Sequence, residues 1–332
     1  MVMPASVETL AAGRPFAADR RWRVRDVRMK FGFGSLLLWS ARFRAVQYEG
    51  AWDALPPDPD EPLPALGDCP PVVRGILVNS HPVEGRISRI ALRRSYIRYS
   101  ASQCRRFFIG LDGSFDEYML RFSPKRRSEL RRKLRVFAER SGGDIHWREY
   151  RDPEEMPEFH RLAREVSAKS YQERMSDAGM PSGDTFVGQL RHMAADGVVR
   201  GHVLFLAGRP VAYQYCVAHG TMIEGVRKGY DPAFRHLSPG TVLLLLSIRR
   251  LFRMGEFRVL DMNRGEFEYK QTFATAHAWC ADIYYFRWTF RNVLLILGHT
   301  ALDLLHATVA GFPGVGRWKK KLRNLVRYGH HS

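Results

Sequence analysis

The chain has 332 residues, 45% of them hydrophobic, so it is long enough to bury a core and to form two domains. Its 52 lysines and arginines against 34 aspartates and glutamates give a formal net charge of +18. That charge predicts an anionic partner: nucleic acid, an anionic membrane surface or a phosphorylated substrate. The four cysteines lie far apart and lack metal-site spacing, which predicts reduced thiols and no metal.

The N-terminal third is expected to be rich in β-strands. Residues 1–20 have no apolar core, so they are no signal peptide and are predicted to be disordered. Residues 21–112 carry short β-type runs, interrupted at 53–71 by a proline-rich, acidic stretch that is typical of an exposed linker. We therefore predict a β-rich N-terminal domain over 21–112.

A different pattern starts at residue 113 and continues to residue 290. Ser123 and the following proline begin an amphipathic, densely basic helix that ends at a glycine pair. A strand, two further helices and three strands joined by tight turns come next. A leucine-rich helix, a strand, a short helix and a last strand complete the order. The fold class is therefore α+β, with a mostly antiparallel sheet flanked by helices.

The leucine-rich helix follows the run "YDPAFRHLSPGT" and is introduced by polar, small and flexible residues. Backbone N–H groups at a helix start lack internal partners and carry the positive end of the helix dipole. This helix start is therefore a candidate anion site, and ordinary capping by the serine is the alternative. The predicted anion-binding residues are Arg235, His236, Ser238, Gly240 and Thr241.

Five stretches carry a resemblance to a known family: "SPKRRSELRRKLRVFAERSGG", "SAKSYQERM", "GRPVAYQYC", "GYDPAFRHLSPGTVLLLL" and "DMNRGEFEYKQTFAT". Together they resemble GNAT-superfamily acetyltransferases associated with bacterial cellulose or exopolysaccharide, which are related to Fem-type transferases and bacterial ceramide synthases. The resemblance covers roughly residues 100–290. It implies a GNAT fold, acyl-CoA as the donor with its pyrophosphate at the helix start, and an amine or hydroxyl acceptor. Of the family's Q/R-x-x-G-x-G/A loop, "RHLSPG" keeps only the arginine and the last glycine.

N-acyl transfer requires a base, a polarised thioester carbonyl and a stabilised leaving thiolate. The resemblance implies that a splayed strand near residues 222–228 supplies a backbone N–H to the carbonyl. Glu266 is the predicted base, at the start of a short helix. Lys270, four residues on, is expected to share its helix face and to hold negative charge; a simple Glu–Lys pair is the alternative. Tyr269 is a candidate proton donor, with packing as the alternative, and Asp261 is a further catalytic candidate.

Acceptor-binding residues are expected from the first helices of this fold. The candidates are Lys169, Tyr171 and Gln172 at a helix end and Tyr213 in the strand meander. An exposed helix end without a ligand is the alternative for the first three.

Residues 291–332 are predicted to be an amphipathic, basic tail at a membrane surface. Asp303 near the middle of the apolar run 293–312 costs about 2.5–3.5 kcal/mol at a bilayer centre, which favours an interfacial helix over a span. His299, Asp303 and His306 form one polar stripe, and "GRWKKKLRNLVRYG" adds a basic segment. A packed helix with a solvated tail is the alternative.

The sequence thus predicts a cytoplasmic enzyme at the inner face of the cytoplasmic membrane. It would transfer an acyl group from acyl-CoA to the amine of a lipid precursor of the long-chain base type, or of an envelope saccharide. One alternative is an acetyltransferase of exopolysaccharide biosynthesis. Another is an RNA-binding protein or aminoacyl-tRNA-dependent transferase, because the basic helix at 125–135 could grip phosphates. Its scarcity of stacking aromatics makes nucleic acid the less favoured partner.

Overall fold

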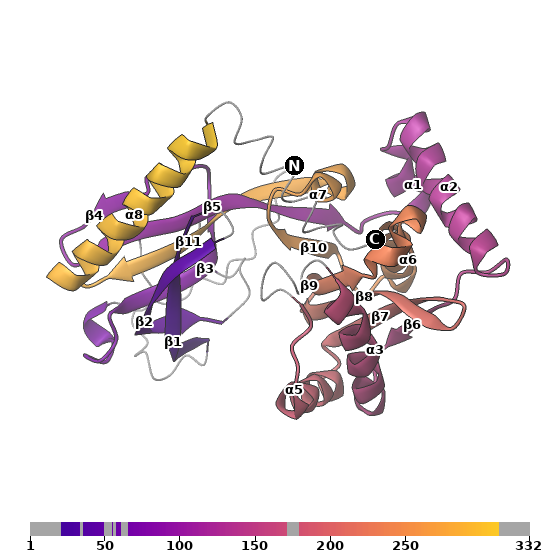
Figure 1. Ribbon diagram of the computed structural model, residues 1–332, viewed down its shortest axis with the longest axis horizontal. Coiled ribbons are helices and arrows are strands. Elements are labelled where there is room, and N and C mark those ends of the chain that lie inside the picture. Colours follow the sequence, from indigo (N-terminus) through magenta and orange to yellow (C-terminus); the bar gives the residue numbers. More distant parts are fainter. Residues whose placement is uncertain are drawn as a thin grey trace. The chain divides into compact units, whose positions relative to one another are not determined.

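Figure 1 shows the structure, a computed structural model. It describes residues 21–33, 36–49, 55, 58–60, 66–170 and 179–311. The chain divides into two compact units. Unit 1 holds the described residues through Arg106, the short piece Arg264–Glu266 and the described residues from His277 onward. Unit 2 holds Phe107–Asn263 and Phe267–Ala276. The expected disorder of residues 1–20 and the basic segment past residue 311 fall outside the described residues.

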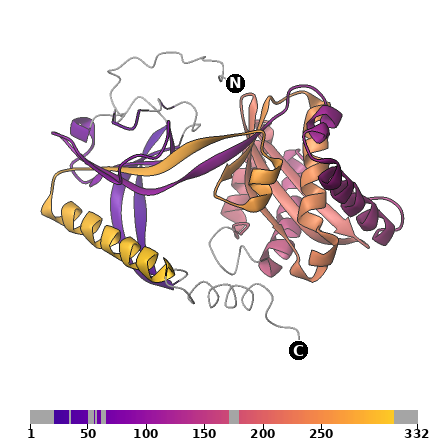
Figure 2. The ribbon, with the colours of Figure 1, turned by 90° about the horizontal axis from the view of Figure 1, so that it is seen from above.

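Unit 1 is built on long strands. These are β1 (Trp22–Phe33), β2 (Leu36–Tyr48), β3 (Gly75–Val83), β4 (Ile90–Leu92), the first part of β5 (Ile97–Gly110) and β11 (Ala276–Phe286), with the 3-10 turn η3 (Leu66–Asp68). Their order is β1-β2-β3-β11-β5, with β4 paired to β5. In β1, Val27, Met29 and Phe31 are buried and the residues between them are exposed, the period-2 pattern of a half-buried strand. The helix α8 (Phe290–Gly311), yellow in Figure 2, covers this buried face beside β1.

Unit 2 contains a mixed sheet in the order β5-β10-β9-β8-β7-β6. Its strands are the end of β5, β6 (Trp147–Tyr150), β7 (Val199–Leu206), β8 (Arg209–His219), β9 (Met222–Tyr230) and β10 (Val259–Arg264). Strands β6 to β9 pair antiparallel, and β10 runs parallel to β9. The helical elements are α1 (Phe115–Leu120), α2 (Pro124–Arg140), η4 (Pro153–Glu155), α3 (Met156–Lys169), α5 (Asp184–Ala195), η5 (Pro232–Leu237), α6 (Pro239–Met254) and α7 (Glu268–Phe273).

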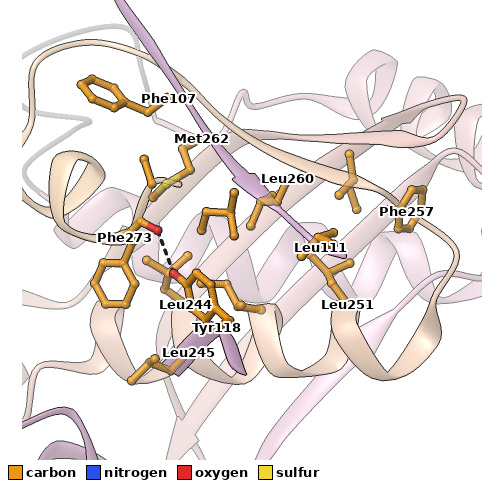
Figure 3. Packing of buried hydrophobic residues seen from close by; sticks show 14 of the residues in the cluster. Phe107, Leu111, Tyr118, Leu244, Leu245, Leu251, Phe257, Leu260, Met262 and Phe273 are labelled. Carbon is orange, nitrogen blue, oxygen red and sulfur yellow. Dashed lines mark hydrogen bonds between the residues drawn. The ribbon is translucent and has the colours of Figure 1, made fainter. Parts of the chain in front are cut away.

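Helices cover both faces of the unit 2 sheet, because successive side chains of a strand point to opposite faces. In β8, Tyr213, Tyr215 and Val217 pack into a cluster with α3 and α5, whereas Ala212 and Cys216 pack toward α6. Figure 3 shows the core on the α6 side of the sheet. There the leucines of α6 pack with Leu260 and Met262 of β10 and with Tyr118 of α1.

The core of Figure 3 also anchors the end of α7. The Tyr118 hydroxyl donates a hydrogen bond of 2.8 Å to the backbone carbonyl of Phe273, and both side chains are buried. The short helix α7 is therefore fixed by α1 rather than by its own six residues, which are too few to be stable alone.

The predicted fold class and element order of unit 2 are confirmed. The first two N-terminal β-type runs form strands as expected: β1 has 12 residues and β2 has 13, paired from Trp22↔Tyr48 to Phe33↔Leu36. The predicted boundaries at 112 and 290 differ from the division of the structure, since unit 2 begins at Phe107. The last strand, β11, joins unit 1 because it pairs antiparallel with β3.

Candidate active site

Strands β9 and β10 diverge within unit 2. Among the described residues they pair at three positions only, ending at Asp261↔Glu224, while β9 continues to Tyr230. A register shift in the β8–β9 ladder adds one extra residue, Val226, to β9 just past this point. Such a bulge bends a strand and re-aims its backbone groups. We call residues 225–230 of β9, together with the end of β10, the β9–β10 fork.

The end of β10 is held in an unusual conformation. Asn263 has φ 66°, in the left-handed region that asparagine tolerates better than most residues. The buried Asp261 carboxylate accepts a hydrogen bond of 2.7 Å from the Asn263 backbone N–H, and the Asn263 side chain donates one of 2.9 Å to Glu224. Both carboxylates thus fix the place where β10 turns away from β9. Strain of this kind clusters at functional sites.

Two lysines lie at the fork. Lys270 of α7 is buried, and its ammonium donates a hydrogen bond of 3.0 Å to the Asn263 carbonyl. Lys228 of β9 is half-buried, and its ammonium lies 4.1 Å from the centre of the Tyr269 ring. Burial strips water from the Lys228 ammonium and the Lys270 charge repels it, which together lower the pKa of Lys228 to about 7. At neutral pH this amine is therefore able to accept a proton.

Tyr269 packs partly into the core beside this lysine. Burial raises the pKa of its phenol, so the hydroxyl stays protonated at neutral pH. A protonated phenol can donate its proton to a leaving thiolate. Its catalytic role stays a prediction.

The expected Glu266–Lys270 pair on one helix face is wrong. The helix α7 begins at Glu268, so Glu266 precedes it. The Glu266 carboxylate instead accepts two hydrogen bonds from the Arg105 guanidinium, one of them 2.9 Å long. This bidentate contact holds the pKa of Glu266 below its usual range, which makes the carboxylate a weaker base. The catalytic role of Glu266 stays a prediction. In the structure its carboxylate is the ion-pair partner of Arg105.

The five residues predicted to bind an anion do lie together, at the junction of η5 and α6. Arg235 and His236 are exposed in the last turn of η5, and Gly240 is the second residue of α6. The Ser238 side chain does not cap the helix; its backbone carbonyl accepts instead from the N–H of Thr241 at 2.9 Å and from the next amide. Ser238 is thus the N-cap residue and Pro239 the first residue of α6, as the capping alternative expects, but the serine side chain makes no capping hydrogen bond. We call this place the η5–α6 junction.

A Cβ on Gly240 would lie 3.3 Å from the Tyr230 ring at the end of β9. The close approach explains why the smallest residue occupies this position. It also places the start of α6 directly against the end of the fork strand. Donor binding by the junction stays a prediction.

The predicted acceptor residues separate into three cases. The Lys169 ammonium lies 3.2 Å from Glu165 and 3.7 Å from Asp231, at the start of η5, so it is close to the η5–α6 junction. Tyr213 is 1% exposed and its hydroxyl donates to Ser167 at 3.4 Å, the surroundings of a packed residue, and its contact with an acceptor stays a prediction. Tyr171 and Gln172 lie outside the described residues.

Sequence reasoning missed Lys228 and Asn263. The signal for Lys228 was present, because a lysine in the middle of an otherwise half-buried strand must lose part of its hydration. Asn263 could not be found, since its role depends on a backbone angle.

Helix α2 presents a second cationic feature of unit 2. A surface hollow of about 520 Å³ is lined by Pro124, Arg127, Ser128, Arg131, Arg132 and Arg135, which we call the α2 arginine surface. The apolar side of this helix, Leu130 and Phe137, is fully buried. Within the described ranges, no group of three or more histidine, cysteine, aspartate or glutamate side chains could hold a metal ion.

In unit 1, α8 turns its polar stripe inward. His299 lies 2.6 Å from the Tyr99 hydroxyl, and Asp303 pairs with Arg89 at 3.1 Å. The outward face carries exposed apolar side chains: Phe290, Leu294, Leu297, Leu304 and Leu305. None of the helices in the described part of the chain combines the length and apolarity needed to cross a membrane.

Comparisons with known proteins address the family. None of the curated proteins matches the sequence. The crystal structure of FemX is 11% identical over 83% of this chain and 90% of that chain, with a TM-score of 0.46. The C-terminal domain of a putative lysylphosphatidylglycerol synthetase from Agrobacterium fabrum is 11% identical over 65% of this chain and 67% of that chain (TM-score 0.43). A PaiA N-acetyltransferase from Thermoplasma acidophilum, in complex with coenzyme A, is 15% identical over 34% of this chain and 75% of that chain (TM-score 0.25).

Residues 124–271 match the family model described as an acetyltransferase (GNAT) domain. This range includes the β9–β10 fork, both of its lysines and the η5–α6 junction. The chain therefore carries a GNAT-type acetyltransferase domain.

Proposed function

We propose that the protein transfers an acyl group from acyl-CoA to an amine, with Lys228 as the general base. The observation that carries this proposal is the half-buried Lys228 ammonium at the β9–β10 fork, inside the acetyltransferase domain. A base works best when its pKa lies near the working pH, and burial next to a second lysine is one way to bring a lysine there.

Each part of the reaction then has a place in unit 2. The η5–α6 junction binds the donor pyrophosphate, through Arg235 and the start of α6. A backbone N–H of β9 past residue 224 polarises the thioester carbonyl. Lys228 takes the proton of the acceptor amine as its nitrogen attacks the carbonyl carbon. The C–N bond forms, the C–S bond breaks, and Tyr269 protonates the thiolate while Lys270 stabilises the negative charge.

The proposed acceptor is the amine of a lipid precursor, collected at the inner face of the cytoplasmic membrane. The outward leucines of α8 support this, because a row of exposed apolar side chains on a surface helix is suited to an interface. Replacing Leu297 and Leu304 by Asn should weaken binding to anionic vesicles. Replacing Thr308, which bonds to the Leu305 carbonyl, is the control on the same helix. Vesicle binding that is unchanged in the double variant would remove α8 from the membrane proposal.

The transferase proposal is tested by thiol release. The purified protein is given acyl-CoAs of increasing chain length with a long-chain amine or an amino sugar, while free CoA thiol and acylated product are followed. We expect product with one acceptor class, and its loss in Lys228→Gln but not in Lys133→Gln. Lys133 is an ion-paired lysine of α2 and serves as the matched control. An enzyme that binds acyl-CoA but acylates neither amine would contradict the acceptor proposal. Acetyl transfer to the sugar alone would favour the exopolysaccharide alternative.

The α2 arginine surface supports a second candidate function. This function is RNA binding, or transfer of an aminoacyl group from aminoacyl-tRNA. Its arginines can pair with phosphates, and such binding weakens steeply with salt. A gel shift with tRNA at low and physiological salt tests this candidate. A complex that survives physiological salt, together with transfer from aminoacyl-tRNA, would replace acyl-CoA as the donor.

A further inference from the structure

Strands β5 and β11 of unit 1 bring two cysteines together that stand 176 residues apart in the sequence. The sulfur atoms of Cys104 and Cys280 are 3.7 Å apart, and the Cys280 thiol also lies 3.3 Å from the Cys104 carbonyl. Both are free thiols. A disulfide needs the sulfurs at about 2.05 Å, so they would have to approach by about 1.7 Å, within the reach of small side-chain rotations and strand shifts.

The surroundings of the two sulfurs are unequal. Cys104 is half-buried, whereas Cys280 is fully buried. The contact with the Cys280 thiol, the Arg264 guanidinium and the Gly265 backbone N–H each favour the thiolate form of Cys104. Burial and Asp282, the ion-pair partner of Arg264, act in the opposite direction. The balance lowers the pKa of Cys104 below that of an ordinary thiol.

The partner thiol is held in the protonated form. The hydrogen bond with Cys104, burial and the neighbouring Cys104 charge raise the pKa of Cys280, and Arg106 offsets only part of this. A half-exposed thiolate beside a protonated second cysteine is the arrangement of a reactive and a resolving thiol.

The remaining two cysteines lack these features. Burial raises the pKa of Cys216 to about 12 and also raises that of Cys69, and both side chains are buried. They are therefore expected to behave as inert packing residues.

We propose that Cys104 and Cys280 form a dithiol site that reacts with hydroperoxides and closes to a disulfide between β5 and β11. The Cys104 thiolate attacks one peroxide oxygen, so that an S–O bond forms, the O–O bond breaks, and hydroxide or alkoxide leaves with two electrons from sulfur. The Cys280 sulfur then attacks the Cys104 sulfur: the S–S bond forms, the S–O bond breaks, and the oxygen leaves as water with the Cys280 proton. Two thiols and one hydroperoxide give one disulfide, one alcohol or water, and one further water. The site does not depend on the transferase proposal.

The test uses the folded full-length protein and hydrogen peroxide. After treatment, remaining thiols are alkylated and the digested protein is analysed by mass spectrometry. We expect a Cys104–Cys280 linked peptide that dithiothreitol releases, with Cys69 and Cys216 alkylated as before. In Cys280→Ser, a dimedone adduct of sulfenic acid should accumulate at Cys104. In Cys104→Ser the reaction should disappear, and in Cys69→Ser it should be unchanged.

The rate of oxidation of the wild-type protein supplies a second readout. This measurement does not depend on the folding of any variant. Oxidation should accelerate with rising pH and level off below the pKa of an ordinary thiol, because the pKa of Cys104 is lowered. An ordinary thiol would keep accelerating to about pH 8.5. Cys104 and Cys280 that remain free thiols in peroxide, or that oxidise without joining, would overturn the proposal.

Discussion

Unit 2 carries positive charge in two settings, the α2 arginine surface and the β9–β10 fork. Arg131, Arg132 and Arg135 are exposed around an open hollow, so water and salt screen them. At the fork, Lys270 is buried and Lys228 half-buried, and the Lys228 ammonium faces an aromatic ring and a second cation. Exposed charge of the first kind collects anions from a distance, whereas desolvated charge of the second kind becomes reactive. The number of cations is therefore a poor guide to chemistry, and their hydration is a better one.

The largest expected effect comes from removing the fork amine. Lys228→Gln cannot accept the acceptor proton, so kcat should fall by about 10²–10⁴-fold with little change in donor affinity. Steady-state kinetics with saturating acyl-CoA measure this. A variant within threefold of wild type would place the base elsewhere.

Stability distinguishes a lost base from a damaged fold. The pKa of Lys228 is about 7 in the folded protein against about 10.4 when unfolded, so between these values the unfolded chain binds more protons. The free energy of unfolding of the wild type should therefore rise with pH between about 7 and 10.4. Below about pH 7 the folded protein carries the full cost of a buried ammonium. Lys228→Met should be more stable than wild type at pH 6, and the difference should shrink toward pH 10. Lower stability of the variant at pH 6 would contradict the proposed desolvation.

The next effect concerns donor binding at the η5–α6 junction. Arg235→Ala removes a charge-assisted contact, and Gly240→Val places a side chain against the Tyr230 ring, so each should weaken CoA binding by about 1–3 kcal/mol. Calorimetry with CoA measures the affinity. Gly240→Ala is the graded control and should fall between wild type and valine. Equal affinities in all four proteins would remove the junction from the donor site.

The α2 arginine surface should show a smaller effect of another kind. Replacing Arg131 and Arg135 by Gln should leave kcat nearly unchanged but reduce the salt dependence of tRNA or anionic-vesicle binding by about two charges. Binding measured at several salt concentrations gives this slope. A large fall in kcat would show that the two cationic regions are not separate in function.

The smallest effect is expected at Glu266. Because Arg105 already holds this carboxylate, Glu266→Gln should change turnover by less than about threefold and stability by less than about 1 kcal/mol. The same kinetic assay gives the comparison with Lys228→Gln. A fall as large as that of Lys228→Gln would restore Glu266 as the base.

Periodicity and turn residues were enough to predict the element order of unit 2. The leucine stripe of α6, the Ser123 cap of α2 and the tight turns of the meander are local signals, and each was found where expected. The partners of Glu266 and Cys104 could not be predicted, because Arg105 and Cys280 are brought to them by strand pairing across more than 150 residues. The i, i+4 spacing of a helix predicted Lys270 as the partner of Glu266. The prediction failed because α7 begins at Glu268, so that Glu266 lies outside the helix.

The pH dependence of kcat/KM tests the central claim most directly. For the wild type, kcat/KM should fall as the pH drops through about 7, because protonation removes the base. In Lys228→Gln this limb should vanish, leaving a low rate that rises only at the higher pH where the acceptor amine is itself neutral. An unchanged limb near pH 7 in Lys228→Gln would show that another group titrates there, and would contradict the assignment of Lys228 as the base.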